Sequence, residues 1–227
     1  MKVLTVDIGN TSIDLCLYEE GRLKHLGKYH HQELLEVPAD LVLVSSVKPS
    51  VEDRVLKLYP KAEFIRSAHV PIKTAFEGKE RVGVDRLLNL YGAIRLFSEN
   101  VLIVSCGTAL VVDLAVEGIF QGGFIVPGLR LSLECLSQKA ELIPLLELER
   151  LFPDIGRDTK TALLGGVLNQ AKAFILQCLE SWQESYKREL KVVLTGGDGW
   201  VFEELGVYDP LLLHKAMLLL KGFYSSF

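Results

Sequence analysis

Two turns that contain glycine could bind phosphate, because each lies between two apolar stretches of β-forming residues. The first is Gly9-Asn10-Thr11-Ser12, preceded by Asp7, and the second is Gly107-Thr108. Backbone N–H groups in such turns form a concave nest that suits phosphate oxygens. A carboxylate beside the nest, here Asp7, could orient a Mg²⁺ ion that bridges phosphates, directly or through water. Asp7 could instead be a turn-forming residue at the end of a strand.

A second candidate cluster is Gly83-Val84-Asp85-Arg86, where a glycine interrupts the chain just before a helical pattern. An aspartate at a helix start could act as a general base toward a hydroxyl group. The adjacent arginine could bind a carboxylate or a phosphate through two parallel hydrogen bonds. The alternative is structural: Asp85 caps the helix and Arg86 lies on the surface.

A third glycine turn, Thr195-Gly196-Gly197-Asp198, follows a short apolar strand and could admit an adenine ring close to its backbone. An ordinary strand-to-helix loop could have the same sequence. The chain contains neither GxxxxGK[ST] nor GxGxxG after a strand. A bound nucleotide would therefore need a different phosphate cradle.

The elements that must position these residues follow from the spacing of apolar side chains. In the first half we expect two strands within 3–18, strands at 22–29 and 40–46, helices at 49–59 and 85–97, and an irregular segment at 66–82. In the second half we expect two strands within 101–113, a strand at 118–126, helical spacing from 129, a helix capped by Thr159 and reaching about 187, a strand at 191–194 and a helix at 210–220.

The opening motif returns in the second half, which indicates an internal duplication. Gly107 lies 98 residues after Gly9, and Glu117-Gly118 lies 97 residues after Glu20-Gly21. Chance similarity of two hairpins is the alternative. Three meandering strands followed by helices and single strands in each half predict an α/β fold of two facing domains, with the boundary near 98–101.

Composition narrows the function classes. The 227 residues are 49% apolar and 24% charged, as in a globular protein, and the net charge of −4 makes nucleic acid and anionic membranes poor partners. Mean hydropathy is +0.26, but no apolar run approaches the ~20 residues of a membrane-spanning helix. The first apolar stretch ends at Asp7, so we expect no signal peptide and a cytoplasmic protein.

The cysteines and histidines show no metal-binding pattern. The four cysteines have no CxxC spacing, so we expect reduced, mostly buried thiols. The five histidines have no metal-ligand spacing.

The ordered set of these motifs resembles the type III pantothenate kinase family over essentially the whole chain. Each motif is weak alone, whereas the order and spacing of the set are specific. The set comprises Asp7-Ile8-Gly9-Asn10-Thr11, Gly83-Val84-Asp85-Arg86, Cys106-Gly107-Thr108-Ala109 with Asp113, Gly122-Gly123, Pro127-Gly128, Gly156-Arg157-Asp158-Thr159 and Thr195-Gly196-Gly197-Asp198.

The resemblance implies membership of the acetate and sugar kinase, heat-shock ATPase and actin superfamily. It implies two ribonuclease-H-like domains with a cleft between them: residues 1–100, which carry the phosphate hairpin and the base motif, and residues 101–227. It also implies ATP-dependent phosphorylation of pantothenate to 4′-phosphopantothenate, the first step of coenzyme A biosynthesis, by a homodimer that uses Mg²⁺.

The roles of individual residues are carried over by position. Asp85 would be the general base. The pantothenate-binding residues would be Phe76, Gly83, Val84, Asp85, Arg86 and Thr159, the last from the same or from the partner subunit. The ATP-binding residues would be Asp7, Ile8, Gly9, Asn10, Thr11, Ser12, Ile13, Asp14, Thr108, Gly196 and Gly197, with Asp7 also at the Mg²⁺ ion.

Two positions depart from the family's pattern. Where the family has an aspartate that ligates K⁺ or NH₄⁺, this chain has Ser105. A neutral hydroxyl is a weaker cation ligand than a carboxylate, so the cation site is either lost or completed by backbone carbonyls. Where the family often has a tyrosine nine residues before the base, this chain has Phe76, which keeps the ring and loses the hydroxyl contact.

Two other functions stay open. The same fold could phosphorylate or dephosphorylate another small anionic substrate, which Arg86 would still bind. A non-catalytic regulatory paralogue would account for Ser105, although the retained Asp7, Asp85 and Thr108 favour an enzyme.

Overall fold

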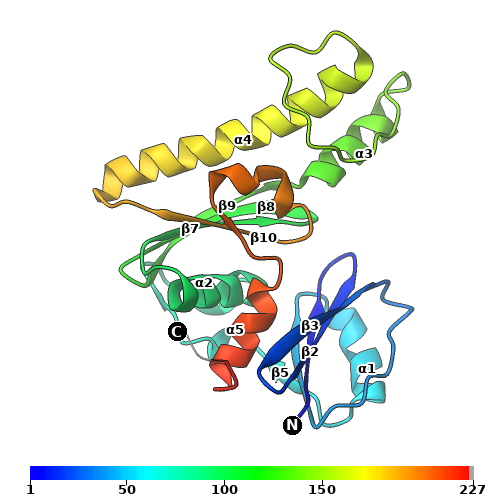
Figure 1. The fold of residues 1–227 in the computed structure, drawn as a ribbon, viewed down its shortest axis with the longest axis vertical. Helices are drawn as coiled ribbons and strands as arrows, with labels where there is room; N and C mark the ends of the chain where they lie inside the picture. The colour runs from blue at the N-terminus through cyan, green and yellow to red at the C-terminus, as the bar shows by residue number, and fades with distance from the viewer. Residues whose placement is uncertain (225–227) are drawn as a thin grey trace. The chain divides into compact units, whose positions relative to one another are not determined.

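The structure, a computed structural model, describes residues 1–224, which form two compact units. The first unit comprises Met1–Ser98, Gly118–Phe120 and residues 211–224, and the second comprises Glu99–Glu117 and Gln121–Pro210. Each unit contains a sheet and helices, as Figure 1 traces along the chain, so the expected α/β class is confirmed.

The first unit is built on a five-stranded sheet in the order β3-β2-β1-β4-β5. β1 pairs antiparallel with β2 and parallel with β4, so the β1–β2 hairpin occupies the middle of the sheet. The elements are β1 (Val3–Ile8), β2 (Ile13–Glu19), β3 (Arg22–Tyr29), β4 (Leu41–Ser46), α1 (Pro49–Leu58), β5 (Glu63–Ile65), η1 (Ser67–His69), β6 (Lys73–Thr74), η2 (Lys79–Arg81), α2 (Val84–Leu96) and α5 (Leu212–Leu220).

Alternation along β1 separates an apolar face of this sheet from a polar one. Leu4, Val6 and Ile8 pack in a buried core that also contains residues of α1. Thr5 and Asp7 lie between them and therefore point to the opposite face. Because the same period of two holds on β2 and β4, polar side chains of three adjacent strands gather on that opposite face.

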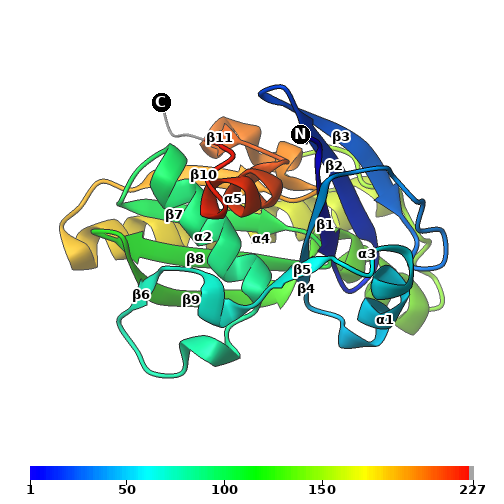
Figure 2. The same cartoon turned by 90° about the horizontal axis from the view of Figure 1, so that it is seen from below.

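Two helices of the first unit, α2 and α5, pack closely against each other, and α5 also contacts β1. Figure 2 shows α5, in red, beside α2, in green. At their crossing, a Cβ atom on Gly92 would lie 3.0 Å from Leu212 Cδ1 and 3.1 Å from Ala216 Cβ. Glycine at this position therefore allows the close approach of the two helices.

The sheet that contains β7 has six strands in the order β11-β10-β7-β8-β9-β6, and five of them, β9-β8-β7-β10-β11, repeat the strand order of the first unit. Its elements are β7 (Val101–Cys106), β8 (Ala109–Val116), β9 (Ile119–Pro127), α3 (Leu129–Lys139), α4 (Thr159–Tyr186), β10 (Lys191–Thr195), η3 (Gly199–Leu205) and β11 (Val207–Tyr208). The turn residues Glu20 and Glu117 both adopt the left-handed conformation, with φ of 52° and 54°, and each precedes a glycine with positive φ. The repeated strand order and turn confirm the expected duplication.

Helix α4 differs from expectation at its first turn. Asp158 is the N-cap, because its Oδ1 atom accepts a hydrogen bond of 2.8 Å from the backbone N–H of Thr161. Thr159, expected to be the cap, is instead the first helical residue. By length and composition α4 could span a membrane. However, a face that includes Leu164, Leu168 and Ile175 packs in the core of the second unit, and core helices pass the same test.

Other differences concern short elements and the last helix. The sequence did not predict β5, β6 or β11, because strands of two or three residues are too short to show alternation. Helix α5, expected from 210, begins at Leu212 and packs in the first unit. The division into domains 1–100 and 101–227 stays a prediction. Among the cysteines, which are all free, only Cys135 is exposed, so the expectation of mostly buried thiols is confirmed.

The crossing of α2 and α5 gives a test of packing. Gly92→Val would place a branched side chain where a single carbon is already tight, and overpacking of this kind costs about 1–3 kcal/mol. We expect chemical denaturation to report a fall of that size in the free energy of unfolding. Gly166→Val is the matched control, because a Cβ atom on this glycine of α4 meets nothing within 4 Å. A similar loss in both variants would contradict the packing argument.

Candidate functional site

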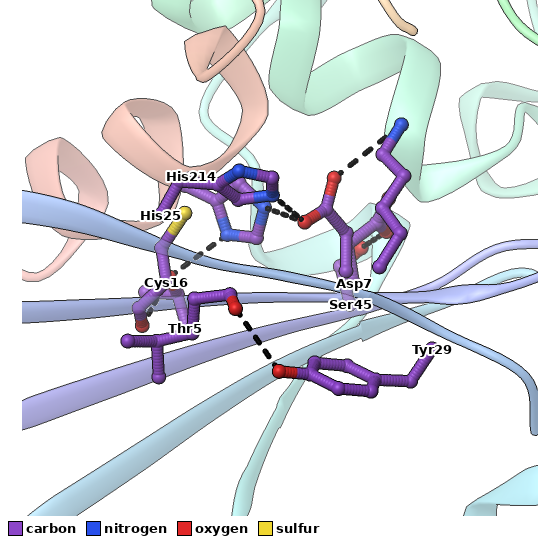
Figure 3. Close-up of polar contacts among 10 residues, drawn as sticks. Thr5, Asp7, Cys16, His25, Tyr29, Ser45 and His214 are labelled. Atoms are coloured by element: carbon purple, nitrogen blue, oxygen red, sulfur yellow. Dashed lines mark hydrogen bonds and ion pairs between the residues drawn. The ribbon is translucent and has the colours of Figure 1, made fainter. Parts of the chain in front are cut away.

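The carboxylate of Asp7 lies at the end of the central strand of the first unit. In the sheet, Asp7 is opposite Asp14 on β2 and Ser45 on β4. The hydroxyl of Ser45 donates a hydrogen bond of 2.5 Å to Oδ1 of Asp7. Figure 3 shows these two side chains together, with His214 of α5 on the same side of the sheet. The pairing of three strands therefore fixes where this carboxylate points.

Two basic residues that the sequence analysis missed hold the turn after β1. The backbone N–H of Gly9 donates to the carbonyl oxygen of Ser12 at 3.0 Å. On the other side, Nε2 of His31 lies 3.0 Å from the Gly9 carbonyl oxygen, and Nζ of Lys48 donates to the Asn10 carbonyl oxygen at 2.9 Å. With these carbonyl oxygens engaged, the turn is held in one conformation. No sequence spacing connects residues 31 and 48 with the turn, so only the fold reveals this contact.

The predicted ATP-binding residues of the hairpin divide into two groups. Ile8 and Ile13 are fully buried in the core with α1, so only their backbone atoms could contact a ligand. Asn10 and Thr11 are exposed at the tip. Thus the turn presents backbone and polar groups, as a phosphate nest requires.

Asp14 is surrounded by basic side chains. Its Oδ1 atom lies 2.7 Å from Nε2 of His25 and 3.8 Å from Nε2 of His214, and its Oδ2 atom lies 3.5 Å from Nζ of Lys28. Burial acts to raise the pKa of this carboxyl group, but the hydrogen bonds and positive charges of these neighbours outweigh burial and hold the pKa below its ordinary value. Asp14 is therefore an anion.

Asp7 has the opposite electrostatic environment. Burial raises the pKa of its carboxyl group to about 6. The hydrogen bond from Ser45 and the charge of His214 act against this rise, whereas the negative charges of Asp85 and Asp14 add to it. Asp7 consequently carries a negative charge at neutral pH at a cost in free energy, and a cation at this position would relieve that cost.

The predicted base, Asp85, lies in the first turn of α2, where the N-cap is Gly83. A Cβ atom on Gly83 would lie 2.5 Å from Oδ1 of Asp85, so the glycine leaves room for the carboxylate. Burial raises the pKa of Asp85, although the backbone N–H and the charge of Arg86 act to lower it. Gly83, and not Asp85, is the N-cap, contrary to the alternative that Asp85 caps the helix. The Asp85 carboxylate still accepts hydrogen bonds from backbone N–H groups of the first turn, which is compatible with a role as base.

A cavity of about 420 Å³ adjoins the base motif in the first unit. Its lining residues are Ser46, Val47, Arg66, Ser67, Ala68, Glu80, Val82, Gly83 and Val84. Arg86 and Phe76, which are close to the base in sequence, both contact the ring of Phe120, a residue that the sequence analysis missed. The guanidinium carbon of Arg86 is 5.6 Å from the centroid of the Phe120 ring. The ring centroids of Phe76 and Phe120 are 5.3 Å apart. Two of the predicted pantothenate-binding side chains thus share one aromatic neighbour.

The two glycine turns of the second unit lie against each other. The backbone N–H of Asp198 donates to the carbonyl oxygen of Cys106 at 3.1 Å, and a Cβ atom on Gly196 would overlap that same oxygen. Gly196 has a φ of 83°, which favours glycine. The Tyr208 hydroxyl donates to the Gly196 carbonyl oxygen at 3.0 Å. The structure therefore brings together the turns that carry Thr108 and Gly196-Gly197.

Ser105 and Thr159 lie in the second unit. Ser105 pairs with Val111 on β8 and with Thr195 on β10. Thr159 is exposed at the start of α4. Within residues 1–224, no group of three or more His, Cys, Asp or Glu side chains could hold a metal ion. A single carboxylate such as Asp7 still fits Mg²⁺, because this ion usually keeps several waters and takes other ligands from substrate phosphates.

Comparison with known proteins points to one family. The sequence profile of the family described as type III pantothenate kinase matches residues 3–181. A type III pantothenate kinase from Aquifex aeolicus is 41% identical over 219 residues, which cover 96% of each chain. Another, from Sulfurihydrogenibium sp., is 26% identical and covers 89% of this chain and 90% of its own.

Among solved structures, a protein from Campylobacter jejuni described as a conserved putative Baf family transcriptional activator has a TM-score of 0.71. It is 22% identical and covers 96% of this chain and 97% of its own. This likeness shows a shared fold over the matched part of the chain. From the match of the family profile and the identity with the Aquifex aeolicus enzyme, we conclude that the chain belongs to the type III pantothenate kinase family.

Proposed function

We propose that this chain transfers the γ-phosphoryl group of ATP to the primary hydroxyl of pantothenate, which yields ADP and 4′-phosphopantothenate. Family membership supports this activity. The observation that carries it further is the half-buried carboxylate of Asp85 at the start of α2, beside a cavity and next to Arg86. A protein that only bound nucleotide would not need a carboxylate there.

In the proposed reaction, Asp85 accepts the proton of the pantothenate hydroxyl as its oxygen forms a bond to the γ-phosphorus. The bond between that phosphorus and the bridging oxygen of ADP breaks, and ADP leaves with the electron pair. Phosphoryl transfer needs alignment and charge neutralisation more than covalent help. Since only an ionised base accepts a proton, the raised pKa of Asp85 means that activity falls as the pH falls toward that pKa.

The remaining residues bind and orient. The turn from Gly9 to Ser12 holds phosphate oxygens, and Asp7 holds a Mg²⁺ ion, which neutralises phosphate charge. Thr108 and the Gly196-Gly197 turn contribute to the nucleotide site. Arg86 pairs with the pantothenate carboxylate, and Phe76 and Thr159 also bind pantothenate.

We also propose a homodimer in the cytoplasm. The second unit has an apolar groove of about 550 Å³ that includes Leu131 and Leu136 of α3 and Phe174 of α4. Phe124 and Ile125 on β9 are 51% and 60% exposed, which is high for large apolar side chains. A second copy of the chain is the occupant that family membership favours for this surface. The acidic net charge of −4 argues against nucleic acid as an alternative.

The role of Asp85 is tested by Asp85→Asn. We expect a fall in kcat of about 10²–10⁴-fold, the usual contribution of a general base, with little change in the KM for ATP. A coupled assay of ADP release with pantothenate as acceptor measures both constants. Asp53→Asn, an exposed aspartate of α1, is the control and should retain full activity. Equal activity of the two variants would exclude Asp85 as the base.

The monovalent cation requirement is tested at Ser105. The neutral hydroxyl at this position does not fit a strong cation site, so we expect turnover to change less than twofold when K⁺ and NH₄⁺ are replaced by tetramethylammonium. Ser105→Asp should then show stimulation by K⁺. A wild-type enzyme that stops without K⁺ would mean that other ligands, such as backbone carbonyls, complete the site.

The burial of Asp7 predicts a conflict between stability and function. The native pKa of about 6 exceeds the ordinary value of 3.8, so the native state loses stability as the pH rises between these values. Asp7→Asn removes this cost, and at pH 7 without Mg²⁺ we expect it to raise the free energy of unfolding by about 2–3 kcal/mol, at ~1.4 kcal/mol per pKa unit. The gain in stability should vanish below pH 4. The variant should also lose its activity. Denaturation curves at both pH values measure this difference; a variant less stable than wild type at pH 7 would contradict it.

A further inference from the structure

His214 is a buried histidine of the first unit that neither the sequence analysis nor the proposed reaction uses. It lies on α5 and is 2% exposed. Its Nδ1 atom is 2.8 Å from the hydroxyl of Thr5 on β1, and its Nε2 atom is 3.8 Å from Oδ1 of Asp14 on β2. His214 thus contacts both strands of the β1–β2 phosphate hairpin, and Figure 3 shows its contact with Thr5.

The hydrogen-bonding options of Thr5 fix the orientation of this contact. The Thr5 hydroxyl, with one proton, also lies 3.2 Å from the carbonyl oxygen of Cys16, to which it can donate. If it donates there, Nδ1 of His214 donates to Thr5, in a ring that is either neutral or an imidazolium. If it donates to Nδ1 instead, the neutral ring carries its proton on Nε2. An Nε2 atom without a proton would direct its lone pair at the Asp14 carboxylate, so the forms with a proton on Nε2 are favoured.

Helix α5 also contacts the helix that carries the proposed base. It packs against α2 at Gly92, where the two helices approach closely. The His214 side chain therefore lies on an element that contacts both the phosphate hairpin and the base helix. A polar group buried to this degree costs free energy unless its partners are retained, so the contact selects one position of the hairpin relative to α5.

Other charged groups around Asp14 do not replace this contact. His25 and Lys28 approach Asp14 from β3, the next strand of the same sheet, and their side chains are 43% and 46% exposed. They tie β2 to β3 and therefore do not connect Asp14 with a helix. Of His25, Lys28 and His214, the last alone approaches Asp14 from a helix.

We propose that His214 is a positioning residue for nucleotide binding: by contacting Thr5 and Asp14 at once, it fixes the β1–β2 phosphate hairpin against the helix pair that carries Asp85. This inference rests on the proposed function, because it assumes that the hairpin holds ATP phosphates. His214 itself contacts no substrate in this account. Its replacement should therefore change the KM for ATP and not the KM for pantothenate.

The test compares His214→Leu, His214→Gln and the wild type. His214→Leu places an apolar side chain of moderate size at this position and removes both polar contacts. We expect the KM for ATP to rise about tenfold, the lower end of the effect of residues that orient a ligand-binding group, while the KM for pantothenate stays within twofold. His214→Gln can still present an N–H group toward Asp14, so it should restore the KM for ATP to within about threefold of wild type.

Leu219→Ala supplies the matched control for a loss of packing. Leu219 is buried on the same helix, and its side chain makes no polar contact. This variant should lose stability without changing the ratio of the two KM values. If His214→Leu raises both KM values equally, or changes neither, or behaves as Leu219→Ala does, the positioning role is wrong.

A direct measurement of ATP affinity separates this inference from the proposed function. Isothermal titration with the non-hydrolysable analogue AMPPNP and Mg²⁺ needs no turnover. A wild-type protein that binds the analogue but does not phosphorylate pantothenate would refute the proposed acceptor, yet weaker binding by His214→Leu, restored in His214→Gln, would still support the positioning role. Unchanged binding by His214→Leu would overturn it.

Discussion

The placement of an ionised carboxylate, Asp7, at the buried end of the central strand is the constraint on which the rest of the first unit depends. Burial raises the pKa of this group to about 6, so its charge at neutral pH must be tolerated by the surrounding structure. Ser45 donates a hydrogen bond to it, and the electrostatic effect of His214 acts to lower its pKa. The alternation of side chains along β1 makes this arrangement possible. One face of the strand packs in the apolar core with α1, and the polar residues lie on the other face.

The second unit uses the same topology with a different set of contacts. Its central hairpin ends in Gly107-Thr108 and packs against the Gly196 turn through the Cys106 carbonyl oxygen. The equivalent strand end carries Ser105 in place of an acidic residue. The two hairpins thus share their strand pairing, and the residue at the strand end differs: the acidic Asp7 in the first and the neutral Ser105 in the second.

Much of this arrangement could be predicted from local patterns. The hairpin turns, the helix at Asp85 and the repeated Glu-Gly turns depend on residues close in sequence, so their spacing is sufficient. The contacts of Lys48, Phe120 and His214 could not be predicted, because each joins residues that only the folded chain brings together. The N-cap of α4 was misplaced by one residue because Asp158 and Thr159 are both good capping residues, and only the hydrogen bond from Thr161 decides between them.

The account's central claim is that the chain transfers a phosphoryl group from ATP to the primary hydroxyl of pantothenate. Identification of the product tests it most directly. The purified protein, incubated with Mg²⁺, pantothenate and ATP labelled with ¹⁸O in its γ-phosphoryl oxygens, should yield 4′-phosphopantothenate that carries the label, with one ADP for each product molecule, by mass spectrometry. Labelled inorganic phosphate without phosphopantothenate would indicate hydrolysis and would contradict the claim, as would the absence of any ADP.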